Sequence, residues 1–99
     1  MSLFPIFLKL AARPCTVIGG GMIAESKIES LKAAEARITV IAPEVTARIA
    51  DLAAAGEVEW VRRGYAAGDL AGQFLVVAAT DDPATNREVF QEARERDIL

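Results

Sequence analysis

The chain has 99 residues, a length that suits one small domain and is too short for two lobes. Hydrophobic residues make up 53% of it and charged residues 25%, which is the composition of a globular protein and not of a disordered one. The formal net charge is -3 and the longest run of cations is Arg62-Arg63, so we expect no broad binding to nucleic acid or to anionic membranes.

The counts of histidine and cysteine limit the chemistry of the chain. There is no histidine, and Cys15 is the single cysteine, which excludes an internal disulfide and a zinc site of the Cys/His kind. Cys15 falls in a predicted strand, so we expect a buried structural thiol and no metal site. The opening segment is apolar but is interrupted by Pro5 and Lys9, which predicts neither a signal peptide nor a membrane span. We expect a cytoplasmic protein.

The first half of the chain predicts a strand, a helix, a strand and a helix, in that order. A short apolar, partly β-branched run at 15–18 is typical of a buried parallel strand. Residues 22–36 place apolar side chains at helical spacing, which predicts a helix packed on a sheet. A second strand is predicted at 37–42. Pro43 suits the first turn of the next helix, which would end at Gly56.

The second half begins with a strand at 58–62, whose charged residues indicate a place near the edge of the sheet. Residues 64–72 predict a loop with one helical turn at Asp69-Leu70. The six apolar residues at 74–79 are typical of a strand that is covered on both faces, so we expect this strand to be central in the sheet.

The last predicted helix begins with Asp82 as N-cap and Pro83 at the first helical position, and it runs to Arg96. Ile98-Leu99 reads as the start of another strand, so we expect the chain to be a fragment. The residues of this helix that we expect to face inward are Val89, Phe90 and Ala93.

Alternating strands and helices with short connections predict an α/β fold with right-handed crossovers. We therefore expect a doubly wound parallel sheet, a Rossmann-like domain that covers residues 1–99 and is truncated at its C-terminal end.

A glycine-rich turn carries the sharpest functional signal. Residues 17–24 read Val-Ile-Gly-Gly-Gly-Met-Ile-Ala and match G-x-G-x-x-A between a predicted strand and a predicted helix. Gly19 would permit the tight turn, Gly21 would let the backbone approach a pyrophosphate, and Ala24 would let helix and strand pack closely. Together with Gly20, the turn presents free helix amides that favour a phosphate.

The end of the second predicted strand bears on the choice of dinucleotide. The fingerprint expects an acidic residue there to hold ribose hydroxyls, and Glu44 lies a little beyond the usual place. Glu44 is equally well explained as an anion in the first turn of the next helix. No arginine stands at the strand end to receive a 2'-phosphate, which favours NAD over NADP, although Arg48 leaves NADP open.

The ligand crevice of an open parallel sheet lies beyond the carboxyl ends of its strands, where the winding direction reverses. This places Thr80 and Asp81 opposite the glycine turn. Thr80 could hydrogen-bond a cofactor ribose or a substrate. Asp81 is a weak catalytic candidate because a solvated loop carboxylate explains it equally well. Asp82 is explained by N-capping alone.

The pattern resembles the siroheme synthase family, specifically its N-terminal precorrin-2 dehydrogenase module. The resemblance rests on four segments: Leu-Phe-Pro-Ile-Phe-Leu-Lys-Leu at 3–10, the glycine run at 17–27, Ile-Thr-Val-Ile-Ala-Pro at 38–43, and Ala-Ala-Thr-Asp-Asp at 78–82 followed by Asn86. It implies that Met22, Ile23, Pro43 and Glu44 contact NAD. The family oxidises precorrin-2, a tetrapyrrole, to sirohydrochlorin with NAD, and many members also insert ferrous iron.

The resemblance also implies what these residues lack. In relatives, a strand from the position of Ile98-Leu99 leads into an N-x-V-D segment with the catalytic aspartate, and a dimerisation region follows. We therefore leave the catalytic residue unassigned, expect a homodimer for the full-length form, and predict that this chain binds NAD weakly and turns over precorrin-2 poorly. The candidates to meet the substrate's carboxylates are Arg62, Arg63 and Arg87, although solvated surface charge explains each of them better.

Two other functions remain open at this point. Regulatory domains that gate potassium transport also pair a glycine turn with a later A-T-x-D-x-x-N stretch, so a nucleotide sensor is an alternative. Such domains usually end their second strand with an acidic residue, where this chain has Ala42. A purely structural domain is the other reading, and it would respond to no nucleotide.

Overall fold

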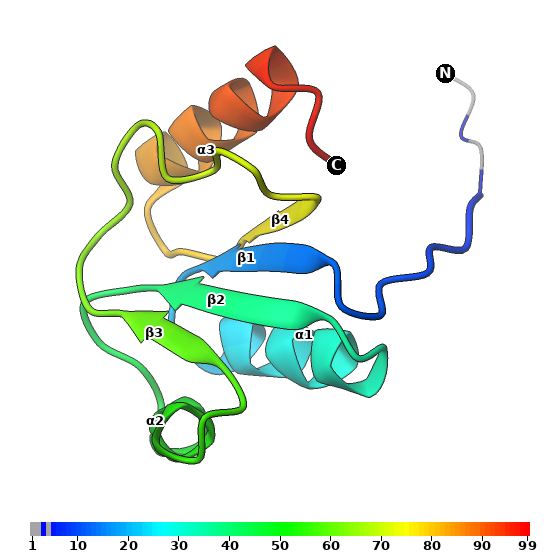
Figure 1. Cartoon of the computed structure of the whole chain (residues 1–99). Coiled ribbons are helices and arrows are strands. Elements are labelled where there is room, and N and C mark those ends of the chain that lie inside the picture. The colour runs from blue at the N-terminus through cyan, green and yellow to red at the C-terminus, as the bar shows by residue number, and fades with distance from the viewer. Residues whose placement is uncertain (1–2, 4) are drawn as a thin grey trace.

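The computed structural model describes residue 3 and residues 5–99, and its centre is a parallel sheet with the strand order β3-β2-β1-β4 (Figure 1). From β1 the chain winds to one side through β2 and β3, and it then crosses back to place β4 on the other side. The predicted doubly wound α/β fold is therefore confirmed. The strands are β1 (Pro14–Ile18), β2 (Arg37–Ile41), β3 (Glu59–Val61) and β4 (Leu75–Ala78).

Helices cover both faces of the sheet. Helices α1 (Met22–Ala33) and α2 (Ala47–Ala54) lie on one face, and α3 (Pro83–Glu95) lies on the other (Figure 1). Successive residues of a strand point to opposite faces, so Val17 packs under α1 while Ile18 packs under α3. None of the helices in the described part of the chain is long and apolar enough to cross a membrane.

The two sides of the sheet hold separate apolar cores. Cys15 is fully buried, as predicted, and burial raises the pKa of its thiol. The core under α1 and α2 is the larger one and includes Cys15, Val17, Ala24, Ile28, Leu31, Ile38, Val40, Ile49, Leu52 and Val58. The core under α3 consists of Ile18, Ile41, Leu70, Val89 and Ala93.

Helix α2 begins later than the sequence pattern indicates. Thr46 is its N-cap, and its hydroxyl accepts a hydrogen bond of 3.2 Å from the Ile49 amide. Pro43 and Glu44 therefore lie in the loop before the helix, and their predicted place in its first turn is wrong. The end of this loop lies against the glycine turn, because the Thr46 amide donates to the Gly20 carbonyl at 2.9 Å.

The prediction that the strand at 74–79 is central is wrong for the described sheet. β4 pairs with β1 alone among the strands, and its residues are half-buried or exposed. Leu99 lies beside its other edge, because the Leu99 amide donates to the Phe74 carbonyl at 3.4 Å and the Val76 amide donates to the Leu99 carbonyl at 2.8 Å. An apolar run alone does not reveal how many neighbours a strand has.

Two smaller expectations about α3 and the loop before β4 are also wrong. Phe90 is 57% exposed, because the buried stripe of α3 runs through Val89, Glu92 and Ala93. The expected helical turn at Asp69-Leu70 is a series of hydrogen-bonded turns in which Leu70 is fully buried. Asp82 is the N-cap of α3 as predicted, since it accepts from the Ala84 amide at 3.1 Å.

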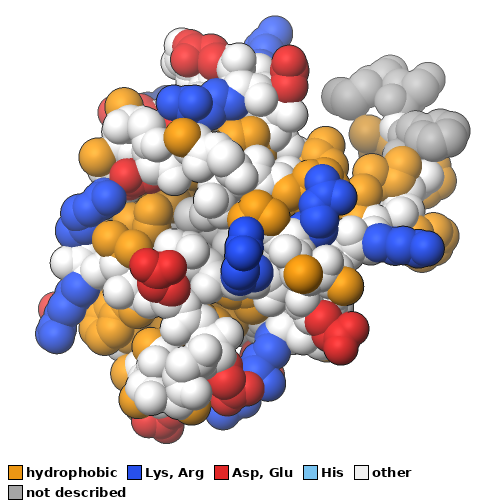
Figure 2. Space-filling view, in the orientation of Figure 1, with side chains coloured by type: hydrophobic (Ala, Val, Ile, Leu, Met, Phe, Trp, Pro, Cys, Tyr) orange, Lys and Arg blue, Asp and Glu red, His pale blue; other side chains and the backbone are white. Residues whose placement is uncertain are grey.

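The segment before β1 leads away from the sheet (Figure 1). Ile6 and Phe7 in it are exposed, and Figure 2 shows hydrophobic side chains gathered there. Phe4, which belongs to the opening segment of the family resemblance, lies outside the described residues together with residues 1–2. On the visible face, Lys and Arg side chains are scattered and form no single patch (Figure 2).

Candidate functional site

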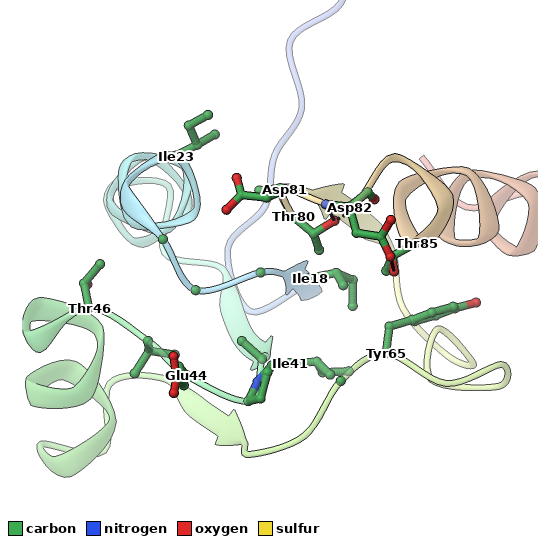
Figure 3. A pocket seen from close by; sticks show the side chains of 18 of the residues that line it. Ile18, Ile23, Ile41, Glu44, Thr46, Tyr65, Thr80, Asp81, Asp82 and Thr85 are labelled. Carbon is green, nitrogen blue, oxygen red and sulfur yellow. Dashed lines mark hydrogen bonds between the residues drawn. The ribbon is translucent and has the colours of Figure 1, made fainter.

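A cleft of about 860 Å³ lies at the carboxyl ends of the strands, where the neighbouring parallel strands β1 and β4 lead into helices on opposite faces of the sheet. Its walls come from the connections that follow all four strands (Figure 3). A cleft of this size accommodates a nucleotide-sized ligand. The residues that the sequence placed in the glycine turn and after the second and fourth strands line it: Gly19, Gly20, Gly21, Met22, Ile23, Pro43, Glu44, Thr80 and Asp81.

Gly19 makes the tight turn out of β1. Its φ of 127° lies in the region that favours glycine, and a Cβ added there would stand 2.3 Å from the Ala79 carbonyl oxygen. The Gly19 amide donates to the Ile41 carbonyl at 3.0 Å, which ties the turn to β2. The tight turn predicted at Gly19 is therefore present.

Gly20 has a packing role that the sequence pattern did not reveal. A Cβ at this position would stand 2.1 Å from the Glu44 carbonyl oxygen, and the Gly20 carbonyl accepts the Thr46 amide at 2.9 Å. The loop after β2 therefore crosses directly against the glycine turn. This close crossing of two backbones requires glycine whether or not a ligand is bound.

Gly21 opens into the cleft. It is the N-cap of α1, it makes no side-chain cap, and a Cβ added there would meet nothing within 4 Å. The first amides of a helix have no intrahelical acceptor, and the helix dipole adds positive potential there. Ala24 is fully buried between α1 and the sheet, which confirms the close packing predicted for it. The turn thus presents free amides to an unobstructed space.

The charged side chains of the cleft are all acidic. Glu44, Asp81 and Asp82 line it, and none of its described lining residues is Lys or Arg. Hydrogen bonds from the Thr85 hydroxyl and the Ala84 amide lower the pKa of Asp82. Any anion in this cleft must therefore be held by backbone amides and not by cations.

Residues 6–99 match a family described as "Putative NAD(P)-binding". The chain belongs to this NAD(P)-binding family. It is 48% identical over 99 residues to the siroheme synthase of Chromobacterium violaceum and 43% identical over 98 residues to that of Methylobacillus flagellatus. The structure of SirC, precorrin-2 dehydrogenase, superposes with a TM-score of 0.84 at 36% identity and covers 89% of this chain.

These comparisons confirm the resemblance to the siroheme synthase family, and the potassium-transport alternative gains no support from them. The chain spans 21% of the length of these two siroheme synthases and 44% of the SirC chain. It is therefore similar to a part of each of those proteins.

The cleft of this NAD(P)-binding chain fits the diphosphate of a dinucleotide. Gly21 leaves space at the start of α1 that a side chain would fill, and the amides there have no side-chain cap to compete with a ligand. Met22 and Ile23 are 75% and 66% exposed at the rim, although both are large and apolar. Side chains of this kind at a cleft rim are available to contact a ligand.

Thr80 belongs to a compact network after β4. Its hydroxyl donates to Asn86 Oδ1 at 2.6 Å, and Asn86 Nδ2 donates back to the Thr80 carbonyl at 3.1 Å. The Asp82 amide donates to the Thr80 hydroxyl oxygen at 3.2 Å. The network fixes the loop that carries Asp81, which lies at the rim between this loop and α1 (Figure 3). Thr80 therefore has a positioning role whether or not it contacts a ligand.

The arginines considered for substrate carboxylates lie outside the cleft. Arg62 stacks over the Trp60 ring at 5.0 Å, and Arg63 makes a bidentate contact with Asp69 at 2.7 Å and 2.9 Å. Arg87 projects from α3 and does not line the cleft. Arg48, which left NADP open, pairs with Glu29 at 3.0 Å.

The sequence reasoning missed Gly64 and Tyr65, which enter the cleft wall from the connection after β3. Tyr65 is held by a hydrogen bond to Glu92 on α3. Two signals could have pointed to them. Tyr65 is the only tyrosine of the chain and lies in a glycine-rich loop, and Glu92 is an acidic residue within the buried stripe of α3.

Proposed function

We propose that this chain is the NAD-binding module of a precorrin-2 dehydrogenase, which oxidises precorrin-2 to sirohydrochlorin. The family match and the likeness to siroheme synthases and to SirC, precorrin-2 dehydrogenase, support the activity. The observation that carries the proposal is the unobstructed, uncapped start of α1 behind Gly21. The side chains of the cleft supply no positive charge, but the free amides at the start of α1 can bind the phosphates of a dinucleotide.

Different residues of the cleft bind different parts of the dinucleotide. The first amides of α1 bind the diphosphate, with Met22 and Ile23 beside it. Glu44 accepts hydrogen bonds from a ribose, and Pro43 contacts the cofactor beside it. Thr80 faces the cofactor from the far side of β1. When bound, NAD accepts a hydride from the substrate, and the residues of this chain bind and orient it.

We propose NAD and not NADP as the cofactor. A 2'-phosphate would stand beside Glu44 and find no cation among the described residues that line the cleft. Arg48 is engaged by Glu29 on the outer side of α1 and α2. A second negative charge beside a carboxylate is unfavourable, so affinity for NADP is expected to be lower by at least about tenfold, roughly 1.4 kcal/mol.

The groups that complete the reaction are proposed to lie in the segments that follow Leu99 in relatives. The resemblance assigns the catalytic aspartate and the dimerisation region there, and the chain spans 21% of its curated relatives. We propose a cytoplasmic homodimer for the full-length form, in which the chelation of ferrous iron as substrate is a further activity. The 99 residues alone are expected to bind NAD and to turn over precorrin-2 poorly.

Calorimetric titration of the chain with NAD and with NADP tests the proposal. Gly21→Val should abolish NAD binding, because its side chain fills the space in front of the amides, and it should lower the free energy of unfolding by no more than about 1 kcal/mol. Ser26→Val introduces the same side chain at an exposed position of α1 and should bind NAD normally. A well-folded wild-type chain that gives no heat with NAD or NADH would contradict the proposal.

A further inference from the structure

One buried carboxylate fastens the connection between β3 and β4 onto α3. The side chain of Glu92 is only 10% exposed. One of its oxygens accepts from the Tyr65 hydroxyl and from the Gly68 amide, the latter at 3.1 Å. The other oxygen accepts from the Leu70 amide at 3.1 Å and from Arg96 Nε at 2.8 Å. Both oxygens are thus used twice, which makes Glu92 the anchor of this loop.

The anchor determines where the Tyr65 ring lies. Leu70, in the same loop, is fully buried with Ile18 and Ile41 under α3, so the loop is pinned on its inner side as well. The hydroxyl of Tyr65 points away from the middle of the cleft, and the ring forms part of the wall (Figure 3). Glu92 itself does not line the cleft and lies 27 positions from Tyr65 along the chain.

Tyr65 is the one aromatic residue among the described residues that line the cleft. Next to it, Ile18 and Ile41 contribute apolar side chains to the floor (Figure 3). Glu44 follows β2 and Tyr65 follows β3, and these two strands are neighbours on the same side of β1. Glu44 and Tyr65 therefore lie on the same side of the cleft. A ribose held at Glu44 would therefore carry its base over the ends of these two strands. A base has a flat π face, and an aromatic ring is its usual packing partner in proteins.

We propose that the Tyr65 ring packs against the adenine base of the dinucleotide and that Glu92 is a positioning residue that holds the ring in place. This inference rests on the proposed function, because it needs a dinucleotide in the cleft. It adds a base-recognition element in the β3–β4 connection, controlled by a carboxylate outside the cleft.

The ionisation of the pair supports the same arrangement. Burial, the hydrogen bond to Glu92 and the nearby charges of Asp69 and Glu88 raise the pKa of Tyr65, so the phenol keeps its proton at neutral pH. Glu92 stays a carboxylate there, with Arg96 as its cationic partner. The donor and the acceptor therefore keep their roles under ordinary conditions.

Titration of the whole chain with NAD and with ADP-ribose, which shares the adenosine part, tests the inference. Tyr65→Ala should weaken the binding of both probes by about fivefold or more, the loss expected for one base–aromatic contact. Glu92→Gln should weaken both by several-fold, and it should cost no further affinity in the Tyr65→Ala background. Tyr65→Phe, which keeps the ring and removes only the tether, should show a smaller loss and keeps the test decisive if Glu92→Gln unfolds.

A spectroscopic readout separates positioning from mere stability. The chain has a single tyrosine, so the near-ultraviolet absorbance of phenolate reports Tyr65 alone. In Glu92→Gln the phenol should ionise at lower pH than in the wild type. Glu95→Gln, an exposed neighbour on α3, is the matched control and should change neither the ionisation nor the affinity.

The outcomes distinguish the two proposals. A folded wild-type chain that binds neither probe overturns the proposed function. A wild type that binds NAD, together with Tyr65→Ala and Glu92→Gln variants of unchanged affinity, overturns this inference and leaves the proposed function standing. If Glu92→Gln weakened the binding of NAD and ADP-ribose equally in the wild-type and Tyr65→Ala backgrounds, the positioning role of Glu92 would likewise be overturned.

Discussion

The hydroxyl of Thr46 donates a hydrogen bond of 2.7 Å to the Glu25 carboxylate, and its oxygen accepts one of 3.2 Å from the Ile49 amide. One side chain thus caps α2 and joins it to the first turn of α1. Because the Thr46 amide also donates to the Gly20 carbonyl at 2.9 Å, the two walls of the cleft meet at this residue. The geometry of the site and the stability of the fold are coupled there.

Thr46→Ala removes the cap and the contact with Glu25 together. We expect the free energy of unfolding to fall by about 1–2 kcal/mol, the usual cost of losing an N-cap with a second hydrogen bond. Urea denaturation followed by circular dichroism measures this loss. Thr46→Ser keeps the hydroxyl and should retain most of the stability, and an equal loss in both variants would argue against the role of the hydrogen bonds.

Gly19 and Gly21 should respond differently to the same substitution. Gly19→Ala places a Cβ 2.3 Å from the Ala79 carbonyl at a φ of 127°, so we expect a loss of about 2 kcal/mol or more. Gly21→Ala meets no atom within 4 Å and should change stability by less than about 1 kcal/mol. Thermal melts of the two variants check this contrast, and equal melting temperatures would contradict it.

Most of the fold could be predicted because its signals are local. The glycine turn, the spacing of apolar residues in α1 and the Asp82 N-cap each depend on a few neighbouring residues. The start of α2 was misplaced because Pro43 and Thr46 both offer a local start signal, and Thr46, the observed N-cap, is also held by a contact with Gly20, which is far away in the sequence. No pattern within Pro43 and its neighbours reveals that contact.

The acidic and glycine-rich parts of the site could be predicted because their signals are also local: each part follows a predicted strand directly. The part of the cleft wall that Tyr65 forms could not be predicted from the sequence, because the position of Tyr65 depends on Glu92, which lies on α3 and is distant in the sequence. The edge position of β4 was also missed. Burial of a strand depends on the elements beside it, and residues 74–79 carry no information about them.

The two neighbours Val89 and Phe90 offer a test of the observed helix orientation. Val89 is 1% exposed and Phe90 is 57% exposed. We expect Val89→Ala to cost about 2 kcal/mol through the cavity it leaves. Phe90→Ser should change the free energy of unfolding by no more than about 0.5 kcal/mol, as at other surface positions. Denaturant unfolding of both variants decides this, and a larger loss for Phe90→Ser would mean that α3 is rotated.

The carboxylate of Glu92 should make stability depend on pH. Burial by itself would raise the pKa of Glu92, but hydrogen bonds from Tyr65, Gly68, Leu70 and Arg96 outweigh it and hold the pKa below the ordinary value of 4.5. A lowered pKa means that the unfolded state binds the proton first as the pH falls. The stabilisation is therefore complete above the ordinary pKa and is lost as the pH drops through the lower value of the folded state.

Glu92→Gln isolates this contribution from those of the other acidic groups. At neutral pH the variant should be less stable than the wild type by about 1–3 kcal/mol, because a charged acceptor of four hydrogen bonds becomes neutral. The difference in unfolding free energy between the two proteins should shrink as the pH falls below 4.5. Urea titrations of both proteins between neutral and acidic pH measure it, and a difference that stays constant would show that the Glu92 carboxylate does not supply the stability.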